Sequence, residues 1–469
     1  MSARPALLRA GLLLAALLAL GPTALPLAIP EAFQRAAAAE SAQEYAAAAD
    51  ALEDAARRLP YEAYVVYRAG LADLAAGRFE GAFQRLTQTA ALSGWTPTLH
   101  VAVGDAEAGR GNRAAALAQW EQASQALPDN DALLARLAAG YEADGRLAEA
   151  LAALARRLQL GVTEPALLYR LALLTAATTP EAAIAPLTTV ANFPSDYTAR
   201  AEQLLRAVQD GLVPADDAYL FGRVGYELIQ LQEWALAERA LSEAVTRNPD
   251  YADAHAYLGL AQDKLGRDGT AAFQMAVDLA PESPLAQFLF GLHYRERGQS
   301  VEALPYLEAA QRLDPENPAI AAEMAGAYAA RNDLPNAELW FSEAVRLAPQ
   351  SPEFWLLLAR FHVDYEWKVA ELGLPAARMA VGLNPESALA HDALGYALIV
   401  TGDFYNGVES LAQALVLDPQ LASGHYHFGL FYAIQNKSAE AREALNRALA
   451  LDPDGPYGNL ALKALALVP

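Results

Sequence analysis

Residues 388–419 read ALAHDALGYALIVTGDFYNGVESLAQALVLDP, and residues 422–453 read ASGHYHFGLFYAIQNKSAEAREALNRALALDP. A glycine, a leucine, an alanine and a proline recur 34 positions apart in the two stretches: Gly395 and Gly429, Leu411 and Leu445, Ala414 and Ala448, Pro419 and Pro453. Matching prolines precede them at steps of 34, 36, 34, 34 and 32 residues: Pro385, Pro349, Pro315, Pro281 and Pro249. A fixed period of this length predicts a solenoid of stacked helices, which grows by adding units rather than by enlarging one core.

Each unit has the pattern of two helices. In residues 285–315 the apolar positions are spaced three and four apart: Phe290, Gly291 and Tyr294 in the first half, then Ala303, Leu307 and Ala310 in the second. Side chains at this spacing share one face of a helix. The glycine lets the two helices approach closely, and a proline ends the second helix. The sequence therefore predicts an antiparallel helix pair in every unit.

This pattern resembles the tetratricopeptide repeat. Glycine fills the small site of the first helix at Gly70, Gly104, Gly225, Gly259, Gly291, Gly395 and Gly429. Alanine fills the small site that opens the second helix at Ala82, Ala116, Ala150, Ala237, Ala303, Ala337 and Ala441. The resemblance covers roughly residues 31–455. It implies an all-α, right-handed superhelical solenoid of about twelve helix-turn-helix repeats, whose first helices line the inner surface.

The repeats divide the chain into five predicted segments. These are residues 1–29, a signal peptide or N-terminal membrane anchor; 30–163, an N-terminal array; 164–217, a divergent repeat with a spacer helix; 218–455, a C-terminal array; and 456–469, a C-terminal apolar helix. Residues 164–217 fit the repeat poorly because Pro186 falls inside the expected second helix. They form either a bend or hinge or a worn repeat.

The N-terminus has the pattern of an export signal. Arg4 and Arg9 precede an uncharged run that continues from Ala10 to Ile29. A positive start and a short apolar run are typical of a signal peptide. The run is also barely long enough for an uncleaved anchor, and a buried first helix of the array is the third possibility. Both export readings place the array outside the cytoplasm, in the periplasm, on the cell surface or secreted, and the composition looks bacterial.

Charge and cysteine content exclude several classes of protein. The chain of 469 residues carries 56 acidic and 34 basic residues, a formal net charge of −22. Such a surface repels a phosphate backbone, so we expect no nucleic-acid partner. The charge favours solubility, or a basic partner. With no cysteine, disulfides, thiolate metal sites and a cysteine nucleophile are excluded.

We find no pattern that predicts catalysis, a cofactor or a metal. His100, His255, His391 and His425 occupy the same first-helix site in their repeats. Equivalent sites in stacked helices lie about 10 Å apart, whereas zinc needs each nitrogen at about 2 Å. The chain has no glycine-rich phosphate loop and no nucleophile elbow. We therefore expect a protein that is not an enzyme.

The inner surface of the predicted solenoid is aromatic and apolar. The candidate partner-binding residues on this surface are Tyr64, Tyr67, Tyr219, Tyr226, Leu285, Phe288, Leu292, Arg295, Arg360, Tyr396 and Tyr426. Such a surface favours an amphipathic helix, or an extended peptide gripped by tyrosines. A shift of one residue in the helical phase would instead bury several of these side chains between helices.

The C-terminus offers a second candidate contact. Leu460, Leu462, Leu465 and Leu467 lie on one short helix and cannot all face the preceding repeat. The helix either meets another subunit or partner, or tucks in and frays at its last turn. The sequence thus predicts an exported scaffold that binds a protein or peptide partner. The alternatives are a self-assembling structural subunit of an oligomer or filament, and an accessory protein for envelope processing.

Overall fold

The computed structural model describes residues 28–468, and side chains from residue 31 onward. The predicted signal or anchor therefore lies outside the described residues, except for its last two positions. The described part contains helices and no β-strand. None of its helices combines the length and the apolar character that crossing a membrane requires. The chain divides into two compact units, residues 1–205 and 206–469, and the boundary falls within the segment 164–217.

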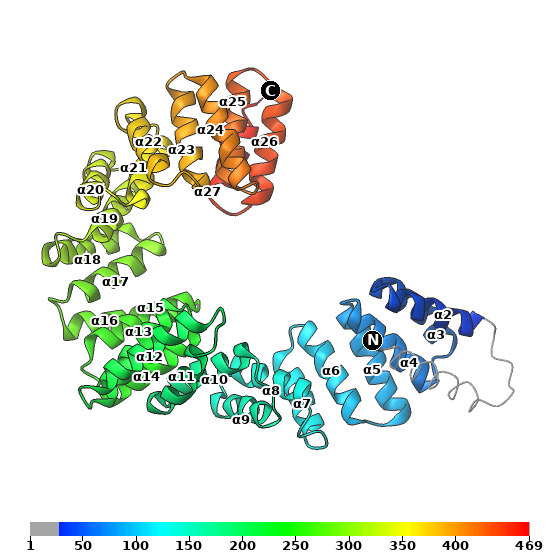
Figure 1. Cartoon of the computed structure of the whole chain (residues 1–469). Coiled ribbons are helices and arrows are strands. Elements are labelled where there is room, and N and C mark those ends of the chain that lie inside the picture. Colours follow the sequence, from blue (N-terminus) through cyan, green and yellow to red (C-terminus); the bar gives the residue numbers. More distant parts are fainter. Residues whose placement is uncertain (1–27, 469) are drawn as a thin grey trace. The chain divides into compact units, whose positions relative to one another are not determined.

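The helices follow one another through short turns (Figure 1). Those that begin in the first unit are α2 (Ala28–Ser41), α3 (Tyr45–Arg58), α4 (Ala63–Ala75), α5 (Phe79–Ser93), α6 (Pro97–Gly109), α7 (Arg113–Ser124), α8 (Asp131–Ala143), α9 (Leu147–Gln159), α10 (Pro165–Thr178), η1 (Pro180–Ala183), α11 (Ile184–Ala191) and α12 (Thr198–Leu212).

The second unit holds a longer series of the same kind. Its helices are α13 (Asp217–Gln230), α14 (Trp234–Arg247), α15 (Ala252–Lys264), α16 (Thr270–Leu279), α17 (Pro284–Glu296), α18 (Ser300–Leu313), α19 (Pro318–Ala330), α20 (Leu334–Leu347), α21 (Pro352–Asp364), η2 (Val369–Gly373), α22 (Leu374–Leu383), α23 (Ala388–Val400), α24 (Phe404–Leu417), α25 (Ala422–Ile434), α26 (Ser438–Leu451) and α27 (Pro456–Leu465).

Consecutive helices pack as pairs, and within each unit each pair packs on the next. Twelve such pairs run from α2–α3 to α25–α26 within the described residues, with α12 between the fifth and sixth and α27 after the last. The predicted all-α solenoid of about twelve helix pairs is confirmed. It has no single central core, because each pair buries its apolar stripe against its neighbours, as in the clusters around Leu86, Leu307 and Phe341.

Glycine in the first helix allows the close crossing within a repeat. A Cβ added to Gly395 would lie 2.7 Å from Cγ of Leu411 and 2.8 Å from its backbone nitrogen. Gly291 stands in the same relation to Leu307, and Gly429 to Leu445. The contact distances show that these glycines are required by space and not by backbone conformation.

The turn between the two helices of a repeat contains a residue in the left-handed conformation. Glycine takes this place at Gly77, Gly111, Gly145, Gly266, Gly298 and Gly402, whereas a side chain occupies it at Gln43, Gln232, Asn332 and Asn436. The φ angle is +73° at Gly298 and +61° at Gln232. A side chain in this conformation is strained, so these turns are not equally stable.

The turn between repeats is fixed by a second recurring contact. The ring Nε2 of His255 lies 2.8 Å from the Pro249 carbonyl oxygen, and His391 stands in the same relation to Pro385 at 2.9 Å. His425, Gln287 and Trp355 repeat the contact with Pro419, Pro281 and Pro349. The recurring histidine is therefore a donor to a helix-terminal carbonyl, and the side chain six residues after the proline needs only an N–H.

Oppositely charged side chains connect neighbouring repeats along the surface. The partners lie 26 to 32 residues apart: Arg68 with Glu40, Arg78 with Asp50, Arg110 with Glu80, Arg136 with Asp105, Arg157 with Asp131, Arg170 with Glu142, Lys264 with Glu296, Arg267 with Glu238, and Lys368 with Glu338. Most of these side chains are at least one-fifth exposed, so each pair contributes about 0–1 kcal/mol. We refer to this set as the ion-pair ladder.

The repeat 352–386 contains two additional residues, and they distort its turn. Glu366 and Lys368 both have positive φ, +48° and +47°, and a π-helix follows at Val369–Gly373. Glu338 of α20 holds the segment, because its carboxylate accepts from Trp367 Nε1 at 2.6 Å and from Lys368 Nζ at 2.8 Å. The insertion thereby places Glu366 beside the first helix of the next repeat.

Candidate inner-face site

The first helices of the second unit form a continuous face. Each first helix from α13 to α25 contacts the next first helix, and α25 contacts α27. Neighbouring second helices make no more than marginal contact anywhere in the described chain. Since the first helices are closer together, the stack bends toward their side. The surface that they form is called the inner face below.

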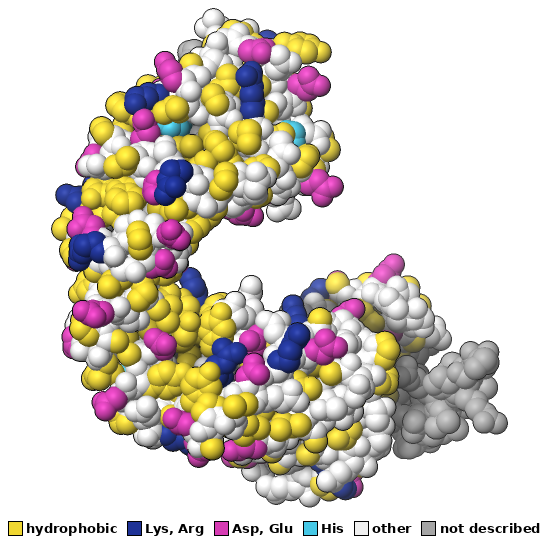
Figure 2. Space-filling model, turned by 60° about the vertical axis from the view of Figure 1, so that its left-hand side comes forward, with side chains coloured by type: hydrophobic (Ala, Val, Ile, Leu, Met, Phe, Trp, Pro, Cys, Tyr) yellow, Lys and Arg dark blue, Asp and Glu magenta, His cyan; other side chains and the backbone are white. Residues whose placement is uncertain are grey.

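The middle of the inner face is open. Leu285, Phe288 and Leu292 lie on successive turns of α17 and are half-buried. Arg295 follows one turn later and forms an ion pair with Glu323 of α19. Burial lowers the pKa of the Arg295 guanidinium from its ordinary value. Figure 2 brings α18–α20 forward, and the hydrophobic side chains that lie side by side there belong to a side of the molecule that includes the second helices α18 and α20. This part of the face offers apolar contacts beside one ion pair.

Tyrosines mark the beginning of the inner face in the second unit. Tyr219 and Tyr226 are half-buried on α13. The ring centroid of Tyr226 lies 5.0 Å from that of Tyr257 on α15, and the Arg223 guanidinium lies 5.8 Å from the Tyr226 centroid. Burial, with smaller contributions from neighbouring Tyr226 and acidic groups, raises the pKa of Tyr257 to about 12. The Tyr257 phenol therefore stays neutral at physiological pH.

The last repeats have a covered inner face. Counted from the glycine of each repeat, Tyr396 corresponds to Leu292 and Asp392 to Phe288. Yet Tyr396 is only 6% exposed and Asp392 only 3%. The ring of Tyr396 stacks on His427 with centroids 4.3 Å apart, and His427 Nδ1 lies 2.7 Å from Asp392 Oδ1. These side chains form a closed polar and aromatic layer.

The cover comes from the C-terminal helix. Tyr457, in the first turn of α27, donates its hydroxyl to Asp364 Oδ1 at 3.1 Å and accepts from Arg360 Nη2 at 3.3 Å. Its ring lies 5.9 Å from the rings of Tyr426 and His427. Burial, followed by the charge of Asp364, raises the pKa of Tyr457 well above its ordinary value. Tyr457 thus spans from α27 to α21 across the face of α25.

The two-residue insertion after α21 contributes Glu366 to this covered end of the inner face. Tyr396 donates its hydroxyl to Glu366 Oε1 at 3.3 Å. Burial, and then the charge of Glu366, raise the pKa of Tyr396. Burial raises the pKa of Tyr426 too, with contributions from Glu366 and Asp364. Three tyrosines and two carboxylates, from four helices and the turn after α21, therefore meet at the covered end of the inner face.

The two tyrosine candidates of the first unit lie in different surroundings. Tyr64 on α4 is 47% exposed, and its ring stacks with Phe33 of α2 at a centroid distance of 6.2 Å. Tyr67 is half-buried and packs against the core around Leu86 and Leu99. The structure assigns Tyr67 packing contacts, whereas Tyr64 presents much of its ring to solvent. The partner-binding role of all these residues stays a prediction.

The leucines of α27 divide between the two sides of the helix. Leu465 packs with Leu445 and Ala461 in the last core cluster. Leu460, Leu462 and Leu467 are exposed by 39%, 57% and 85%. Leu460 and Leu462 on α27, and Leu467 just after it, are thus exposed apolar side chains at the end of the array.

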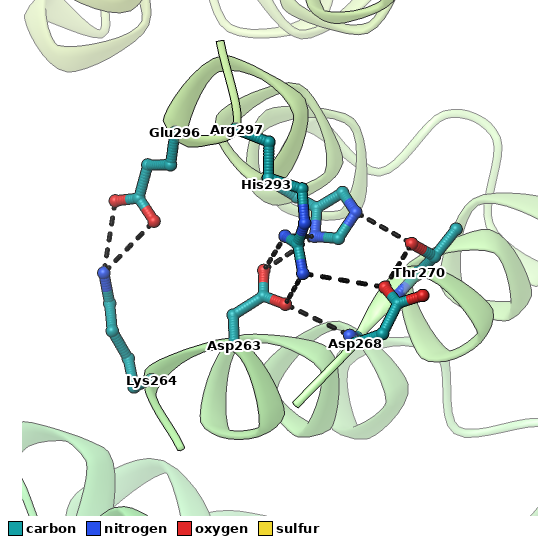
Figure 3. Close-up of polar contacts among 8 residues, drawn as sticks. Asp263, Lys264, Asp268, Thr270, His293, Glu296 and Arg297 are labelled. Carbon is teal, nitrogen blue, oxygen red and sulfur yellow. Dashed lines mark hydrogen bonds and ion pairs between the residues drawn. The ribbon is translucent and has the colours of Figure 1, made fainter. Parts of the chain in front are cut away.

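A polar cluster joins α15 to α17 (Figure 3). The Asp263 carboxylate lies 3.0 Å from Arg297 Nη2 and 2.7 Å from His293 Nδ1, while His293 Nε2 lies 2.9 Å from Thr270 Oγ1. Ligand atoms of Asp263, Asp268 and His293 lie within 4.8 Å of one another, close enough for a metal ion. However, the Arg297 guanidinium is between the two carboxylates, 3.6 Å from Asp268. The cluster therefore contains its own cation and ties two repeats together.

Sequence reasoning missed Tyr457, Asp364, Glu366 and Asp392 as parts of the inner face. The two-residue excess near Tyr365–Lys368 was one available signal, because an insertion between repeats brings additional side chains to a helix end. Tyr457 had no signal in the repeat pattern, since it follows the last complete repeat.

Comparison with known proteins agrees with the repeat pattern. Models described as tetratricopeptide repeat match residues 225–284, 294–361 and 393–456, all within the second unit. No curated protein matches the chain in sequence.

Several solved structures share the helical-repeat architecture. Yeast Tom70 is 16% identical, with 87% of this chain and 94% of that chain covered and a TM-score of 0.38. YrrB, described as a TPR protein with an unusual peptide-binding site, is 24% identical, with 41% and 97% covered and a TM-score of 0.32. PilF of Pseudomonas aeruginosa is 17% identical, with 45% and 96% covered and a TM-score of 0.40. At these scores the likenesses say nothing about a partner of this chain.

The helix pairs, the small residues where they cross and the three matched segments lead to one conclusion about the second unit, and the first unit repeats the same pattern. Residues 225–456 carry tetratricopeptide repeats, and the described chain is an all-α solenoid of helix pairs with the same pattern.

Proposed function

We propose that this protein is an exported, non-enzymatic scaffold of bacterial origin that holds a helix or peptide of a partner protein on its inner face. The tetratricopeptide-repeat architecture supports protein–protein interaction as the general function. The observation that supports the finer proposal is the stretch of α17 where Leu285, Phe288 and Leu292, on successive turns, are only partly buried. Apolar side chains at this spacing match one face of an amphipathic partner helix.

The ion pair beside this stretch would set the orientation of the bound partner helix. Arg295 and Glu323 offer one charge of each sign next to the apolar contacts, and burial already weakens the hydration of Arg295. A partner carboxylate that reaches Arg295 competes with Glu323 and thereby fixes the partner's register. Truncating an apolar anchor at the centre of such a contact costs about 1–3 kcal/mol, or roughly 10-fold to 100-fold in the dissociation constant.

Affinity capture from gently solubilised cells, followed by mass spectrometry, tests the proposal. The tagged wild-type protein is compared with a Phe288→Ala/Leu292→Ala double variant. The matched control is Leu339→Ala, which removes a leucine that is 59% exposed on the second helix α20. We expect a dominant partner that the control retains and the double variant loses. Retention by the double variant, with an unchanged helical spectrum, would rule out the open inner face.

Export rests on the predicted signal or anchor in residues 1–29. Fractionation of cells that express the full chain tests it, alongside a variant in which Leu13 and Leu17 are replaced by Arg. We expect the wild-type protein outside the cytoplasm and the variant inside, because charges interrupt the apolar run. Equal cytoplasmic recovery of both proteins would contradict export.

A structural subunit is the second candidate function, and the exposed side of α27 favours it. Leu460, Leu462 and Leu467 form an apolar end to the array. Light scattering over a range of protein concentrations distinguishes this candidate from a monomeric scaffold. A mass that rises with concentration, and falls to that of a monomer in a Leu462→Ser/Leu467→Ser variant, would support self-assembly.

A further inference from the structure

The covered end of the inner face differs from the open middle although the same repeat positions build both. Leu285, Phe288 and Leu292 are partly buried in α17. Two of the three corresponding residues in α23, Asp392 and Tyr396, are exposed by only 3% and 6%, whereas Leu389 stays partly buried. Two positions of α23 therefore lose nearly all their contact with water. Since every first helix has the same neighbours within its own stack, the difference requires a cover from outside the repeat.

Tyr457 of α27 lies beside these residues and contacts His427, which stacks on Tyr396. Its hydroxyl bonds to Asp364 and Arg360, which precede it by 93 and 97 residues. Its ring lies against Tyr426 and His427. A hydroxyl that both donates and accepts, and an aromatic ring placed on aromatic side chains, are the features of a bound ligand rather than of a surface side chain.

Besides Tyr457, α27 is attached through packing and at its two ends. The helix has ten residues, too few to be stable alone in water. Ala461, Ala464 and Leu465 pack against the core cluster around Leu445 of α26. Asp452 caps the first turn by accepting from the backbone nitrogens of Tyr457 and Gly458, at 2.9 and 3.3 Å. Arg442 of α26 donates to the Val468 carbonyl oxygen at 2.7 Å.

We propose that the inner face of α21–α25 is a helix-docking site whose resident occupant is the chain's own C-terminal segment, residues 456–468. The site recognises a short helix that presents a phenol hydroxyl to the pair formed by Arg360 and Asp364. A partner segment of the same chemistry binds there only when α27 is released. This inference rests on the proposed scaffold function and deepens it, because it names a second inner-face site, its ligand class and its control.

The tether gives the resident helix an advantage over any free competitor. A short connection holds a segment at an effective concentration in the millimolar range. A free peptide therefore binds to the wild-type protein only in proportion to the fraction of molecules with α27 released. Weakening α27 within the full chain raises that fraction without changing the site.

The direct test uses the chain's own segment as the probe. A fluorescent peptide with the sequence of residues 453–468 is titrated into the full-length wild-type protein and into a full-length Tyr457→Ala variant, and binding is followed by anisotropy. Loss of two hydrogen bonds and a ring contact in the variant should release α27, so we expect at least tenfold tighter peptide binding than to wild type. A peptide that carries Phe in place of Tyr457 should bind the variant more weakly, because it lacks the hydroxyl.

Two site variants localise the result. Arg360→Met, combined with Tyr457→Ala, should weaken peptide binding, whereas the combination with Leu339→Ala should not, because Leu339 lies on a second helix. Equal binding of the peptide to wild type and Tyr457→Ala, or no binding to either, would overturn the proposal. If the Phe peptide binds the variant as tightly as the Tyr peptide does, the hydroxyl does not contribute to recognition.

Hydrogen exchange of the unmodified protein is an independent measurement. If α27 is a displaceable ligand, its amides should exchange faster than those of α23–α26, and Tyr457→Phe should accelerate exchange in α27 alone. Joint exchange of α25, α26 and α27 in both proteins would show an integral end helix and overturn the proposal. Neither experiment uses an external partner, so the failure of partner capture at Phe288 and Leu292 and the failure of this inference remain distinguishable.

Discussion

Replacing Gly395 by alanine separates the effect of helix propensity from that of helix crossing. Alanine in place of a helical glycine gains about 0.5–1 kcal/mol in folding free energy. At Gly395 the new Cβ meets Leu411 Cγ at 2.7 Å and the Leu411 backbone nitrogen at 2.8 Å. Rotation of the leucine side chain relieves the first contact but not the second. Overpacking of this kind costs about 1–3 kcal/mol, so we expect Gly395→Ala to destabilise the fold by about 1–2 kcal/mol.

Gly382 provides the matched control. It lies in helix α22 of the same unit, and a Cβ there has no neighbour within 4 Å. Gly382→Ala should therefore stabilise the protein by about 0.5–1 kcal/mol. Urea unfolding monitored by far-ultraviolet circular dichroism gives the sign of each change. Because a repeat array does not always unfold as one unit, hydrogen exchange in α23 and α24 locates the loss. Equal stabilisation by both substitutions would refute the role of Gly395 in the crossing.

Three further predictions concern the polar contacts and turns. Although burial alone would raise it, hydrogen bonds from Arg297 and His293 hold the pKa of Asp263 below its ordinary value. The ionised carboxylate therefore stabilises the fold at neutral pH, and this stabilisation is lost as the pH falls below about 4. Asp263→Asn should reduce the difference between the urea midpoints measured at pH 7 and at pH 3. An unchanged difference would contradict this prediction. His391→Leu leaves the Pro385 carbonyl without its donor and should lower the free energy of unfolding by about 0.5–1.5 kcal/mol, measured by thermal unfolding. His391→Gln should lower it less, because Gln287 makes the same contact in α17. Equal losses in the two variants would refute the donor role. Gln232→Gly should stabilise the protein by about 0.5–1 kcal/mol in urea unfolding, because φ is +61° at this position. Gly298→Ala should have the opposite effect. If neither substitution changes the stability, these turns carry no strain.

The sequence was sufficient for the repeat architecture because each repeat's signals are local. A glycine opposite a leucine, an alanine at each crossing and a proline at each end all act within about 34 residues, as Gly395, Leu411 and Pro419 do. The same residues recur in register, so each unit supports the interpretation of the next. The predicted fold class needed no knowledge of long-range packing.

The inner face was less accessible to sequence reasoning. The helical phase predicts Phe288 and Leu292 on the inner face, where the structure shows them partly buried, but it carries no information about a cover. Tyr396 occupies the same repeat position as Leu292, yet it is buried, because His427 stacks on its ring and Glu366 of the insertion accepts its hydroxyl. Its predicted role in partner binding stays open for the state in which α27 is released. A contact between residues more than 90 positions apart produces no periodic pattern in the sequence, so sequence analysis does not detect it.

Because the ion-pair ladder links neighbouring helix pairs, the stability within a pair and the coupling between pairs should depend differently on salt. Apolar burial within each helix pair is almost unaffected by moderate ionic strength, whereas exposed charges that link neighbouring pairs are screened over about 8–10 Å. Added salt therefore weakens the coupling between repeats more than the repeats themselves. In a linear array, weaker coupling shortens the number of units that open together. The protein should pass from long cooperative segments toward independent repeats, and its bending stiffness should fall at the same time.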